Sequence, residues 1–537
     1  MRLPSWARGL VPQILALTTF ASGAILLFSG SMPLDIIRLK LMQNFVPLPL
    51  IEISHFLGSL VGVVLLFLAW GLMQRLDSAY WMTLALLLGG ILFSLVNGFN
   101  YEEAAILALI FLAILPTQKL FYRKGSLIVH RMTRGWIFLI ALVLLSSVYV
   151  GIFSFKNIAY SDDLWWRFET SADVSRFLRA TMGVAIFVLL FSLAKLIQPS
   201  SPKFMISTLQ DFQKASGVIK NSSSCRAYLG LLRDKNFLFN KKQNAFIMYR
   251  IYAKSWVALG DPVGPKEEWK ELVWEFHRLA DLYNGWSVFY EIGKEDLPLY
   301  LDMGLTLLKI GEEAKVPLAS FSYEDPFYRE FKNTEKKIEE KGHSFEVIPL
   351  NEVPSFLPEL KAVSDAWLKN LKTREKGFSL GFYDENYLKK FPIGVVRKEG
   401  RVFAFANILE GADKEECSAD LVRYVSEGSA KGVMDYLLSH LLLNGKSKGY
   451  RWFNLGMAPL SGFESEGGAP LWHRFGAFLC KHGENFYNFR GIRFYKEKFK
   501  PVWEPRYLAS PGGFALPRVL TDIAALNSRG VKGLFIK

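Results

Sequence analysis

A basic and aromatic segment near the C-terminus, residues 485–507, carries the side chains best suited to contact an anionic polymer. Cationic groups neutralise phosphates, and aromatic rings stack on unpaired bases or fill a hydrophobic core. An edge strand with a solvated charged face has the same composition, and composition alone favours that second interpretation. Aromatic residues alternate in this segment with six cations: Arg490, Arg493, Lys496, Lys498, Lys500 and Arg506.

The charge balance points to an anionic partner, whereas the cysteines point to no metal. A net charge of +14 over 537 residues is typical of proteins that meet nucleic acid or anionic lipid headgroups. Cys225, Cys417 and Cys480 lie far apart and form no CxxC pair, so neither a disulfide framework nor a zinc site is expected. His473 and His482 flank Cys480 without a fourth ligand at metal spacing. We therefore expect neither a metal nor a cofactor.

Long apolar segments recur from residue 9 to about residue 198, a pattern typical of bilayer-spanning helices. A cleaved signal peptide would give a single such segment. Residues 160–179 combine aromatic residues with scattered charges, so they form either an interfacial amphipathic helix or an ordinary loop. We expect about six spans, near residues 9–30, 54–73, 80–97, 103–116, 135–153 and 179–197.

The charges between the spans predict their orientation. Arg2 and Arg8 precede the first span, Arg75 follows the second, and five basic residues lie within residues 119–134. Acidic residues dominate the other connections, with two basic exceptions near residue 40. Because cytoplasmic loops carry the excess of Lys and Arg, the N-terminus and everything after residue 200 should lie in the cytosol.

The second part of the chain has the pattern of a soluble α/β protein. Beyond a linker at residues 199–203, short apolar runs alternate with turn signals. A strand–helix–strand pattern occurs near residues 306–348 and again near residues 419–455, with a strand expected at 419–426. These two occurrences predict two related α/β units in tandem.

The expected domains are thus a membrane domain at residues 1–200 and two α/β units at 201–349 and 350–537. In the second unit, residues 427–432 lie between a strand and a helix, where an acyltransferase of the GNAT superfamily would hold a pyrophosphate on helix N-terminal amides. The glycine pattern of acetyl-CoA binders is absent there. A similar fold with a different acyl donor is therefore favoured.

Seven short motifs follow one another along the second part of the chain: Gly260-Asp-Pro-Val-Gly264, Tyr290-Glu-Ile-Gly293, Lys309-Ile-Gly-Glu-Glu313, Arg374-Glu-Lys-Gly-Phe378, Asp420-Leu-Val-Arg423, Asn454-Leu-Gly-Met-Ala-Pro-Leu-Ser461 and Phe489-Arg-Gly-Ile-Arg-Phe-Tyr-Lys496. In this order they resemble the bacterial phosphatidylglycerol lysyltransferase family, the multiple peptide resistance factors. The resemblance covers the whole cytosolic part and no single motif carries it.

The resemblance implies an α-helical transmembrane bundle followed by tandem GNAT-like acyltransferase folds in the bacterial cytoplasmic membrane. It implies transfer of an aminoacyl group, most simply lysyl, from aminoacyl-tRNA to the glycerol hydroxyl of phosphatidylglycerol, which gives resistance to cationic antimicrobial peptides. The implied partners are aminoacyl-tRNA, phosphatidylglycerol and the anionic inner leaflet, and the resemblance is compatible with a homo-oligomer. Larger family members add an N-terminal flippase module, and about six spans match only the synthase-associated part.

Two pairs of charged residues are the first candidates for the implied site. A carboxylate such as Asp420 can hold a substrate ammonium while Arg423 keeps that carboxylate ionised and oriented. Residues three apart on a regular strand face opposite sides, so joint action requires a β-bulge. The same condition applies to Lys309 and Glu312. As ordinary residues, each pair would be an ion pair at a strand edge.

The remaining candidates would contact the aminoacyl ester or the tRNA. Lys496 would stabilise the developing charge or contact the terminal tRNA phosphate, and a turn at residues 456–461 would present Ser461 and backbone amides to the ester. Phe378 would line the donor pocket or pack in the core. Because no Ser/His/Asp set is evident, we expect direct attack by the lipid hydroxyl. General attraction of tRNA and headgroups is assigned to Arg490, Arg493, Lys498 and Lys500.

Two other functions fit the same sequence. A membrane-tethered acyltransferase could use another donor, such as an acyl thioester. Alternatively, the spans could form a lipid transporter whose cytosolic part is a non-catalytic module. Within the lysyltransferase interpretation, the sequence leaves open whether lysine, alanine or arginine is transferred.

Overall fold

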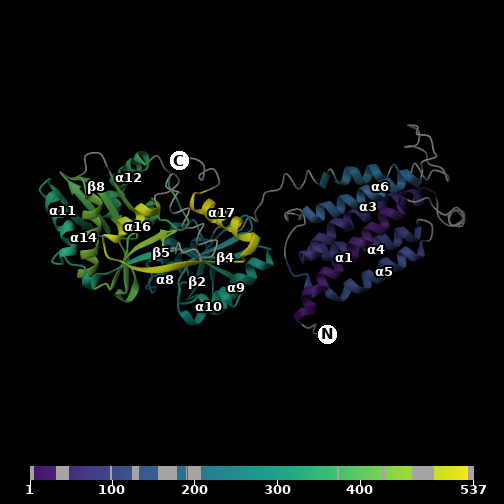
Figure 1. Cartoon of the computed structure of the whole chain (residues 1–537), viewed down its shortest axis with the longest axis horizontal. Coiled ribbons are helices and arrows are strands. Elements are labelled where there is room, and N and C mark those ends of the chain that lie inside the picture. Colours follow the sequence, from purple (N-terminus) through teal and green to yellow (C-terminus); the bar gives the residue numbers. More distant parts are fainter. Residues whose placement is uncertain are drawn as a thin grey trace, which may run out of the picture. The chain divides into compact units, whose positions relative to one another are not determined.

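The computed structural model describes chiefly residues 5–31, 48–96, 100–123, 134–154, 180–188, 207–371, 374–425, 430–462 and 489–529. The chain forms two compact units (Figure 1). One contains residues 1–202 together with 281–284, and the other contains residues 203–280 and 285–537.

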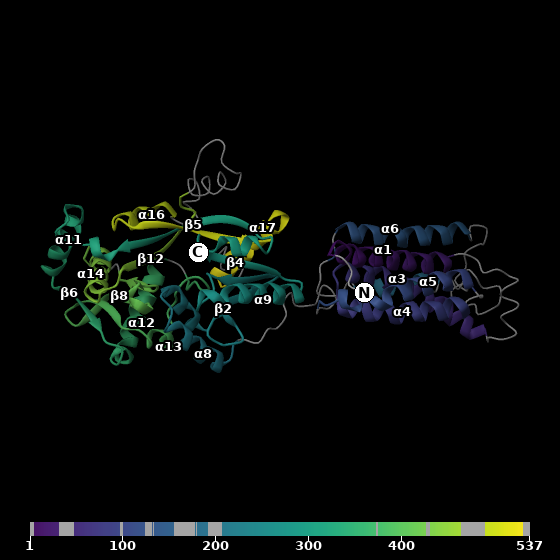
Figure 2. The same cartoon turned by 90° about the horizontal axis from the view of Figure 1, so that it is seen from below.

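The first unit is a bundle of apolar helices that run alongside one another (Figure 2): α1 (Ser5–Ser29), α3 (Leu48–Met73), α4 (Asp77–Val96), α5 (Tyr101–Ile114), the short 3-10 helix η1 (Leu115–Leu120) and α6 (Arg134–Ser154). Helices α1 and α3 approach closely at two glycines. A Cβ atom on Gly23 would lie 2.6 Å from the Gly62 carbonyl oxygen, and one on Gly62 would lie 2.8 Å from that of Gly23. Small residues at such crossings are typical of helices packed within membranes.

Five segments of this unit are long and apolar enough to cross a membrane: Leu10–Ser29, Ile53–Met73, Asp77–Val96, Tyr101–Leu120 and Gly135–Phe153. They agree with the first five predicted spans. Residues 180–188 are helical, but most of the predicted span at 179–197 and of the predicted interfacial segment at 160–179 lie outside the described residues.

The second unit is built on two sheets. The larger has nine strands in the order β1 (Asn236–Phe239), β2 (Phe246–Tyr252), β3 (Ser255–Leu259), β4 (Trp286–Ile292), β13 (Val502–Ser510), β5 (Thr306–Pro317), β12 (Trp452–Pro459), β10 (Glu416–Ser418) and β9 (Leu409–Glu410). The smaller has four, in the order β11 (Val422–Tyr424), β8 (Arg401–Asn407), β7 (Ile393–Lys398) and β6 (His343–Ile348).

Helices cover these sheets and complete their cores. The principal ones are α8 (Leu209–Ile219), the 3-10 helix η3 (Cys225–Leu232), α9 (Trp269–Leu282), α10 (Leu297–Leu301), α11 (Arg329–Glu339), α12 (Val353–Asn370), α13 (Glu385–Leu388), α14 (Val433–Ser447), α16 (Phe489–Glu497) and α17 (Leu516–Asn527). Strand β3 is buried along its whole length and pairs in parallel with β4 after the crossover through α9. Both faces of such a strand are covered, which explains its continuous apolar sequence.

The predicted strand–helix–strand elements are present, but in each pattern the two strands belong to different sheets. The strand within residues 419–426 is β11, which lies in the four-stranded sheet, whereas β12 lies in the nine-stranded sheet, with α14 between them in the sequence. Strands β5 and β6 are likewise divided between the two sheets, with α11 between them in the sequence. The nine-stranded sheet takes strands from both sides of residue 349, so the division into units 201–349 and 350–537 stays a prediction.

The interpretation of residues 485–507 as an edge strand is wrong. Within the described part of this segment, α16 holds residues 489–497, and β13 lies between β4 and β5 inside the sheet. The strand predicted at residues 419–426 is also shorter, because β11 covers only Val422–Tyr424. The basic and aromatic residues at 489–497 are compatible with either a strand or an amphipathic helix. In the structure these residues form the helix, which packs onto the sheet.

Candidate active site

A bulge in β5 brings Lys309 and Glu312 together. Against β13, the pairing shifts from Gly311 opposite Arg506 to Lys309 opposite Tyr507, so β5 contains one extra residue. The Lys309 Nζ atom therefore lies 2.9 Å from a Glu312 carboxylate oxygen, an ion pair that strict strand alternation would prevent. The bulge that joint action of these residues requires is present.

Backbone from β12 and the turn after it closes over this pair. The Lys309 ammonium also donates a 2.6 Å hydrogen bond to the carbonyl oxygen of Gly462. A Cβ atom at Gly462 would clash with the Glu312 carboxylate, and one at Gly311 would clash with the Ala458 carbonyl oxygen. Close backbone approach thus requires glycine at position 311, whereas at Gly462 the neighbour is a side chain and the positive φ of 67° favours glycine.

Helix α16 adds a guanidinium to the same carboxylate. Arg493 forms an ion pair with Glu312, and its guanidinium lies 4.3 Å from the centre of the Trp503 ring. Burial acts to raise the pKa of Glu312, but hydrogen bonds from Lys309 and Arg493 outweigh it and lower that pKa. The carboxylate is therefore ionised at neutral pH and holds two cations in place.

Lys496 lies one turn beyond Arg493 on α16, at a second irregularity. Strand β12 has an extra residue before Met457, and the Lys496 ammonium donates hydrogen bonds to the carbonyl oxygens of Gly456 at 2.9 Å and Met457 at 3.0 Å. Burial lowers the pKa of Lys496 to about 8, although the carboxylate of Glu313 acts to raise it. We call Lys309, Glu312, Arg493 and Lys496 the bulge cluster.

Ser461 lies beside the bulge cluster but is occupied by a local contact. Its buried hydroxyl donates a 2.7 Å hydrogen bond to the Ala458 carbonyl oxygen. The predicted turn at residues 456–461 is wrong in its first part, because β12 continues to Pro459. The bulge lets the strand continue through Gly456, which the sequence pattern indicated as a turn residue.

The predicted pairing of Asp420 with Arg423 is wrong. The Asp420 carboxylate accepts hydrogen bonds from the Tyr387 hydroxyl at 2.6 Å and from the Asn407 amide at 2.5 Å. Arg423 instead forms an ion pair with Glu375 at 3.0 Å. Asp420 precedes the short strand β11 and Arg423 lies within it, and the charge of Asp420 still acts to raise the pKa of Arg423. Burial raises the pKa of Asp420, while its two hydrogen bonds act to lower it.

The other predicted residues lie apart from the bulge cluster or outside the described side chains. Phe378 is fully buried in the hydrophobic core, so core packing is its role in this fold. Lys498 forms an ion pair with Asp435 at 3.1 Å, and Lys500 lies 3.6 Å from Asp325. The side chain of Arg490 is outside the described residues.

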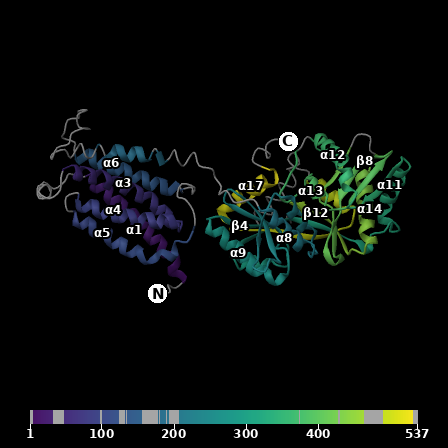
Figure 3. The same cartoon turned by 180° about the vertical axis from the view of Figure 1, so that it is seen from behind.

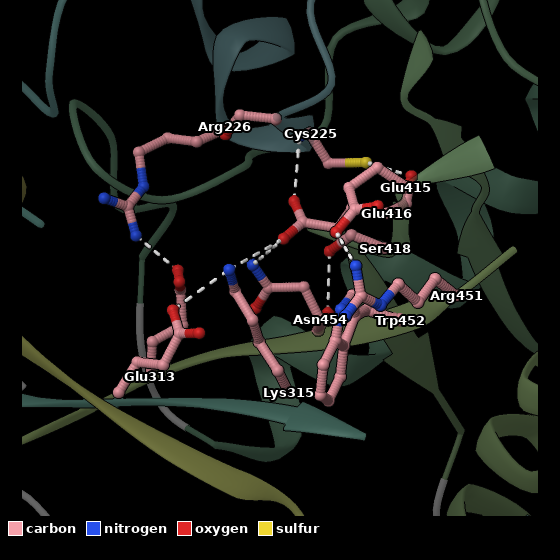
Figure 4. A network of polar contacts seen from close by, with 12 residues as sticks. Cys225, Arg226, Glu313, Lys315, Glu415, Glu416, Ser418, Arg451, Trp452 and Asn454 are labelled. Carbon is pink, nitrogen blue, oxygen red and sulfur yellow. Dashed lines mark hydrogen bonds and ion pairs between the residues drawn. The ribbon is translucent and has the colours of Figure 1, made fainter. Parts of the chain in front are cut away.

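Sequence reasoning missed a network of buried charges around Glu313 (Figure 4). Glu313 forms ion pairs with Arg226 from η3 and Arg506 from β13, and Arg226 also donates a 2.6 Å hydrogen bond to the Glu291 carbonyl oxygen. Burial alone would raise the pKa of Glu313, but the two guanidinium groups lower it strongly. The segments that supply these three residues are far apart in the sequence, so the sequence alone could not show that they meet. Its one indication was that Glu313 follows the candidate residue Glu312.

The network continues to Glu416, which the sequence did not single out. Lys315 lies 3.0 Å from Glu504 and 3.6 Å from Glu416, so two carboxylates share one ammonium. Glu416 also accepts hydrogen bonds from the Asn454 amide at 3.1 Å and the Cys225 backbone at 2.9 Å (Figure 4). These groups border a polar cavity of about 880 Å³, whose lining includes Arg226, Asp261, Lys315, Glu416, Glu504 and Arg506. Its volume is within the range of small-molecule sites.

The same segments match a known family of enzymes. The family model described as phosphatidylglycerol lysyltransferase, C-terminal, matches residues 218–510, which is more than half of the chain. The chain belongs to this family. The match includes every residue of the bulge cluster and of the charge network around Glu313.

Curated members of the family are longer than this chain. The phosphatidylglycerol lysyltransferase of Bacillus subtilis (strain 168) is 32% identical over 506 residues, which cover 92% of this chain and 57% of that protein. The phosphatidylglycerol lysyltransferase of Staphylococcus aureus (strain MRSA252) is 40% identical over 277 residues, which cover 51% of this chain and 32% of that protein. The chain thus spans little more than half the length of the Bacillus subtilis protein.

Two solved structures have the same fold as the second unit. The C-terminal domain of a putative lysylphosphatidylglycerol synthetase from Agrobacterium fabrum is 38% identical, with a TM-score of 0.56, over 61% of this chain and 100% of that one. L-PGS from Bacillus licheniformis is 36% identical, with a TM-score of 0.52, and the match covers 59% of this chain and 96% of that one. They confirm the α/β part of the predicted fold class, and the five apolar helices of the first unit agree with the part predicted to cross the membrane.

Proposed function

We propose that this chain transfers a lysyl group from aminoacyl-tRNA to the glycerol hydroxyl of phosphatidylglycerol at the cytosolic face of the bacterial cytoplasmic membrane. Relatives named phosphatidylglycerol lysyltransferase support the lysyl group and the acceptor lipid. Five apolar helices support a membrane location, and the basic connections between them support the cytosolic orientation. Added lysyl groups would make the membrane less anionic, which would give resistance to cationic antimicrobial peptides.

The buried ammonium of Lys496 is the observation that carries the proposal. Two carbonyl oxygens hold it at the β12 bulge, and burial brings its pKa to about 8. An ammonium held in a water-poor place stabilises negative charge more strongly than one in water, and a pKa near ambient pH suits proton transfer. Lys496 would serve the carbonyl oxygen on which charge develops when the ester is attacked.

The remaining cations of the bulge cluster suit phosphate. Lys309 and Arg493 carry two positive charges against the single carboxylate of Glu312, which leaves an excess of one. Both proposed substrates carry phosphodiester groups close to their reacting oxygens. Charge-assisted hydrogen bonds from Lys309 and Arg493 would orient one of them, and Glu312 keeps both side chains in position.

The reaction is proposed as a direct transfer. The lipid hydroxyl oxygen bonds to the lysyl carbonyl carbon, the bond from that carbon to the tRNA ribose oxygen breaks, and the lipid proton passes to the ribose oxygen. The lysyl side chain would extend into the polar cavity, where the carboxylates of Glu416 and Glu504 would attract its ammonium group. Oriented binding supplies much of the acceleration.

The test uses the full-length chain in vesicles that contain phosphatidylglycerol. Lysyl-tRNA, alanyl-tRNA, arginyl-tRNA and an acyl-CoA are supplied separately, and the lipids are analysed by mass spectrometry. We expect lysyl-phosphatidylglycerol from lysyl-tRNA and no product in vesicles of phosphatidylethanolamine alone. Consumption of acyl-CoA with charged tRNA left intact would identify the other class of acyltransferase. Absence of any modified lipid would favour the non-catalytic binding module.

A further inference from the structure

Helices α11 and α14, which pack against each other, bring together three potential metal ligands away from the bulge cluster (Figure 1, Figure 3). Glu335 and Glu339 lie one turn apart on α11, and His440 faces them from α14. One ligand atom from each residue lies within 4.8 Å of the other two, and the His440 Nε2 atom is 3.1 Å from a Glu335 carboxylate oxygen. The sequence could not show this grouping, because His440 is a hundred residues beyond the two glutamates.

The contact of the Nδ1 atom of His440 determines the orientation and the tautomer of its imidazole ring. Nδ1 lies 3.0 Å from the backbone carbonyl oxygen of Tyr436, which only accepts hydrogen bonds. The proton of a neutral imidazole therefore belongs on Nδ1, which leaves a lone pair on Nε2. Metal-binding histidines are commonly oriented by this kind of contact to a backbone carbonyl.

The lone pair of Nε2 faces another acceptor, the carboxylate of Glu335. Two acceptors at 3.1 Å need a positive charge between them, either a proton or a metal ion.

We propose that Glu335, Glu339 and His440 bind one divalent transition-metal ion that joins α11 to α14. One imidazole nitrogen and two carboxylate oxygens, with water in the fourth position, match the ligands of Zn²⁺ best, and the nitrogen disfavours Mg²⁺ and Ca²⁺. Bonds of about 2.0–2.2 Å require the three side chains to draw closer, which rotations of the two glutamates provide. The proposal is independent of the lysyl-transfer reaction.

The first test measures metal binding to the full-length protein in detergent micelles after treatment with a chelator. Calorimetric titration with ZnCl₂ should show one site per chain, and MgCl₂ should show none. His440→Gln and Glu335→Gln should each weaken Zn²⁺ binding at least tenfold. The matched control is Glu330→Gln, an exposed carboxylate on the same helix, which should bind as the wild type does. Equal affinity in all four proteins, or no saturable binding, would overturn the proposal.

A second measurement uses only the wild-type protein, so it remains informative even if the variants do not fold. One equivalent of Cu²⁺ added to the chelator-treated wild-type protein should give an electron paramagnetic resonance spectrum split by a single imidazole nitrogen. A signal with only oxygen ligands, or with several nitrogens, would overturn the proposal. A protonated His440 paired with Glu335, the ordinary alternative, would show no Zn²⁺ binding together with an imidazolium that persists at neutral pH in NMR spectra.

Discussion

Replacing Lys496 by methionine should stabilise the folded protein at neutral pH while it removes most of the transfer activity. The pKa of Lys496 falls from the ordinary value of 10.5 to about 8 on folding. Each pKa unit corresponds to about 1.4 kcal/mol, so the charged form costs about 3 kcal/mol of folding free energy at pH 7. Methionine has a similar length and carries no charge, and it avoids this cost.

Two lost hydrogen bonds reduce the expected gain. The carbonyl oxygens of Gly456 and Met457 would lose their donor in the Lys496→Met variant, at about 1 kcal/mol each. A net stabilisation of about 1 kcal/mol remains at pH 7. Between pH 8 and 10.5 the unfolded wild-type chain binds more protons than the folded one, so wild-type stability rises with pH and the advantage of the variant disappears.

The assay follows the apparent unfolding temperature of the full-length protein in micelles from pH 6.5 to 9.5, together with lysyl-phosphatidylglycerol formation. Removing one group that stabilises an oxyanion typically lowers the rate by about 10² to 10³-fold. Lys496→Arg is the control, since it keeps a charge that does not titrate here. Wild-type transfer should fall above about pH 8, and the Arg variant should not show that fall.

The reasoning about Lys496 would be refuted by either of two results. In the first, the methionine variant is less stable than the wild type at pH 7 by an amount that does not change with pH. In the second, that variant retains transfer within tenfold of the wild-type rate. The first would mean that the ammonium is not destabilised by burial, and the second that the developing charge is stabilised by another group.

Three further substitutions and one control test the fold and the surrounding site. Gly311→Ala should lower stability by about 1–3 kcal/mol in thermal unfolding because its Cβ atom clashes with the Ala458 carbonyl oxygen. Gly217→Ala, in open space on α8, should instead raise stability by about 1 kcal/mol. Asp420→Asn should gain stability relative to the wild type as pH rises above about 4, since burial raises the folded pKa of this carboxyl group above its unfolded value; a pH-independent difference would contradict this. Glu312→Gln should lower the kcat/KM of lysyl transfer at least tenfold, and unchanged kinetics would remove the bulge cluster from the site.

Local features of the sequence were sufficient for most element types, although not for α16 or the end of β12. Apolar runs of about twenty residues predict membrane-crossing helices because a helix rises 1.5 Å per residue and the hydrocarbon core is about 30 Å thick. Five such segments are present among the described residues. The order of motifs in the second part identified the family, and the residue types of the bulge cluster were visible in those motifs.

Only the tertiary structure decided which charges meet. Lys309 reaches Glu312 because β13, almost two hundred residues away, pairs with β5 out of step by one residue. Asp420 and Arg423 are close in sequence and yet have different partners, because β11 is short and the Asp420 carboxylate is held by Tyr387. Hydrophobic periodicity reports the burial of a local segment, whereas register and bulges depend on pairing between distant segments. For this reason the sequence determined most of the elements and the residue types, and the sheet pairing determined the site.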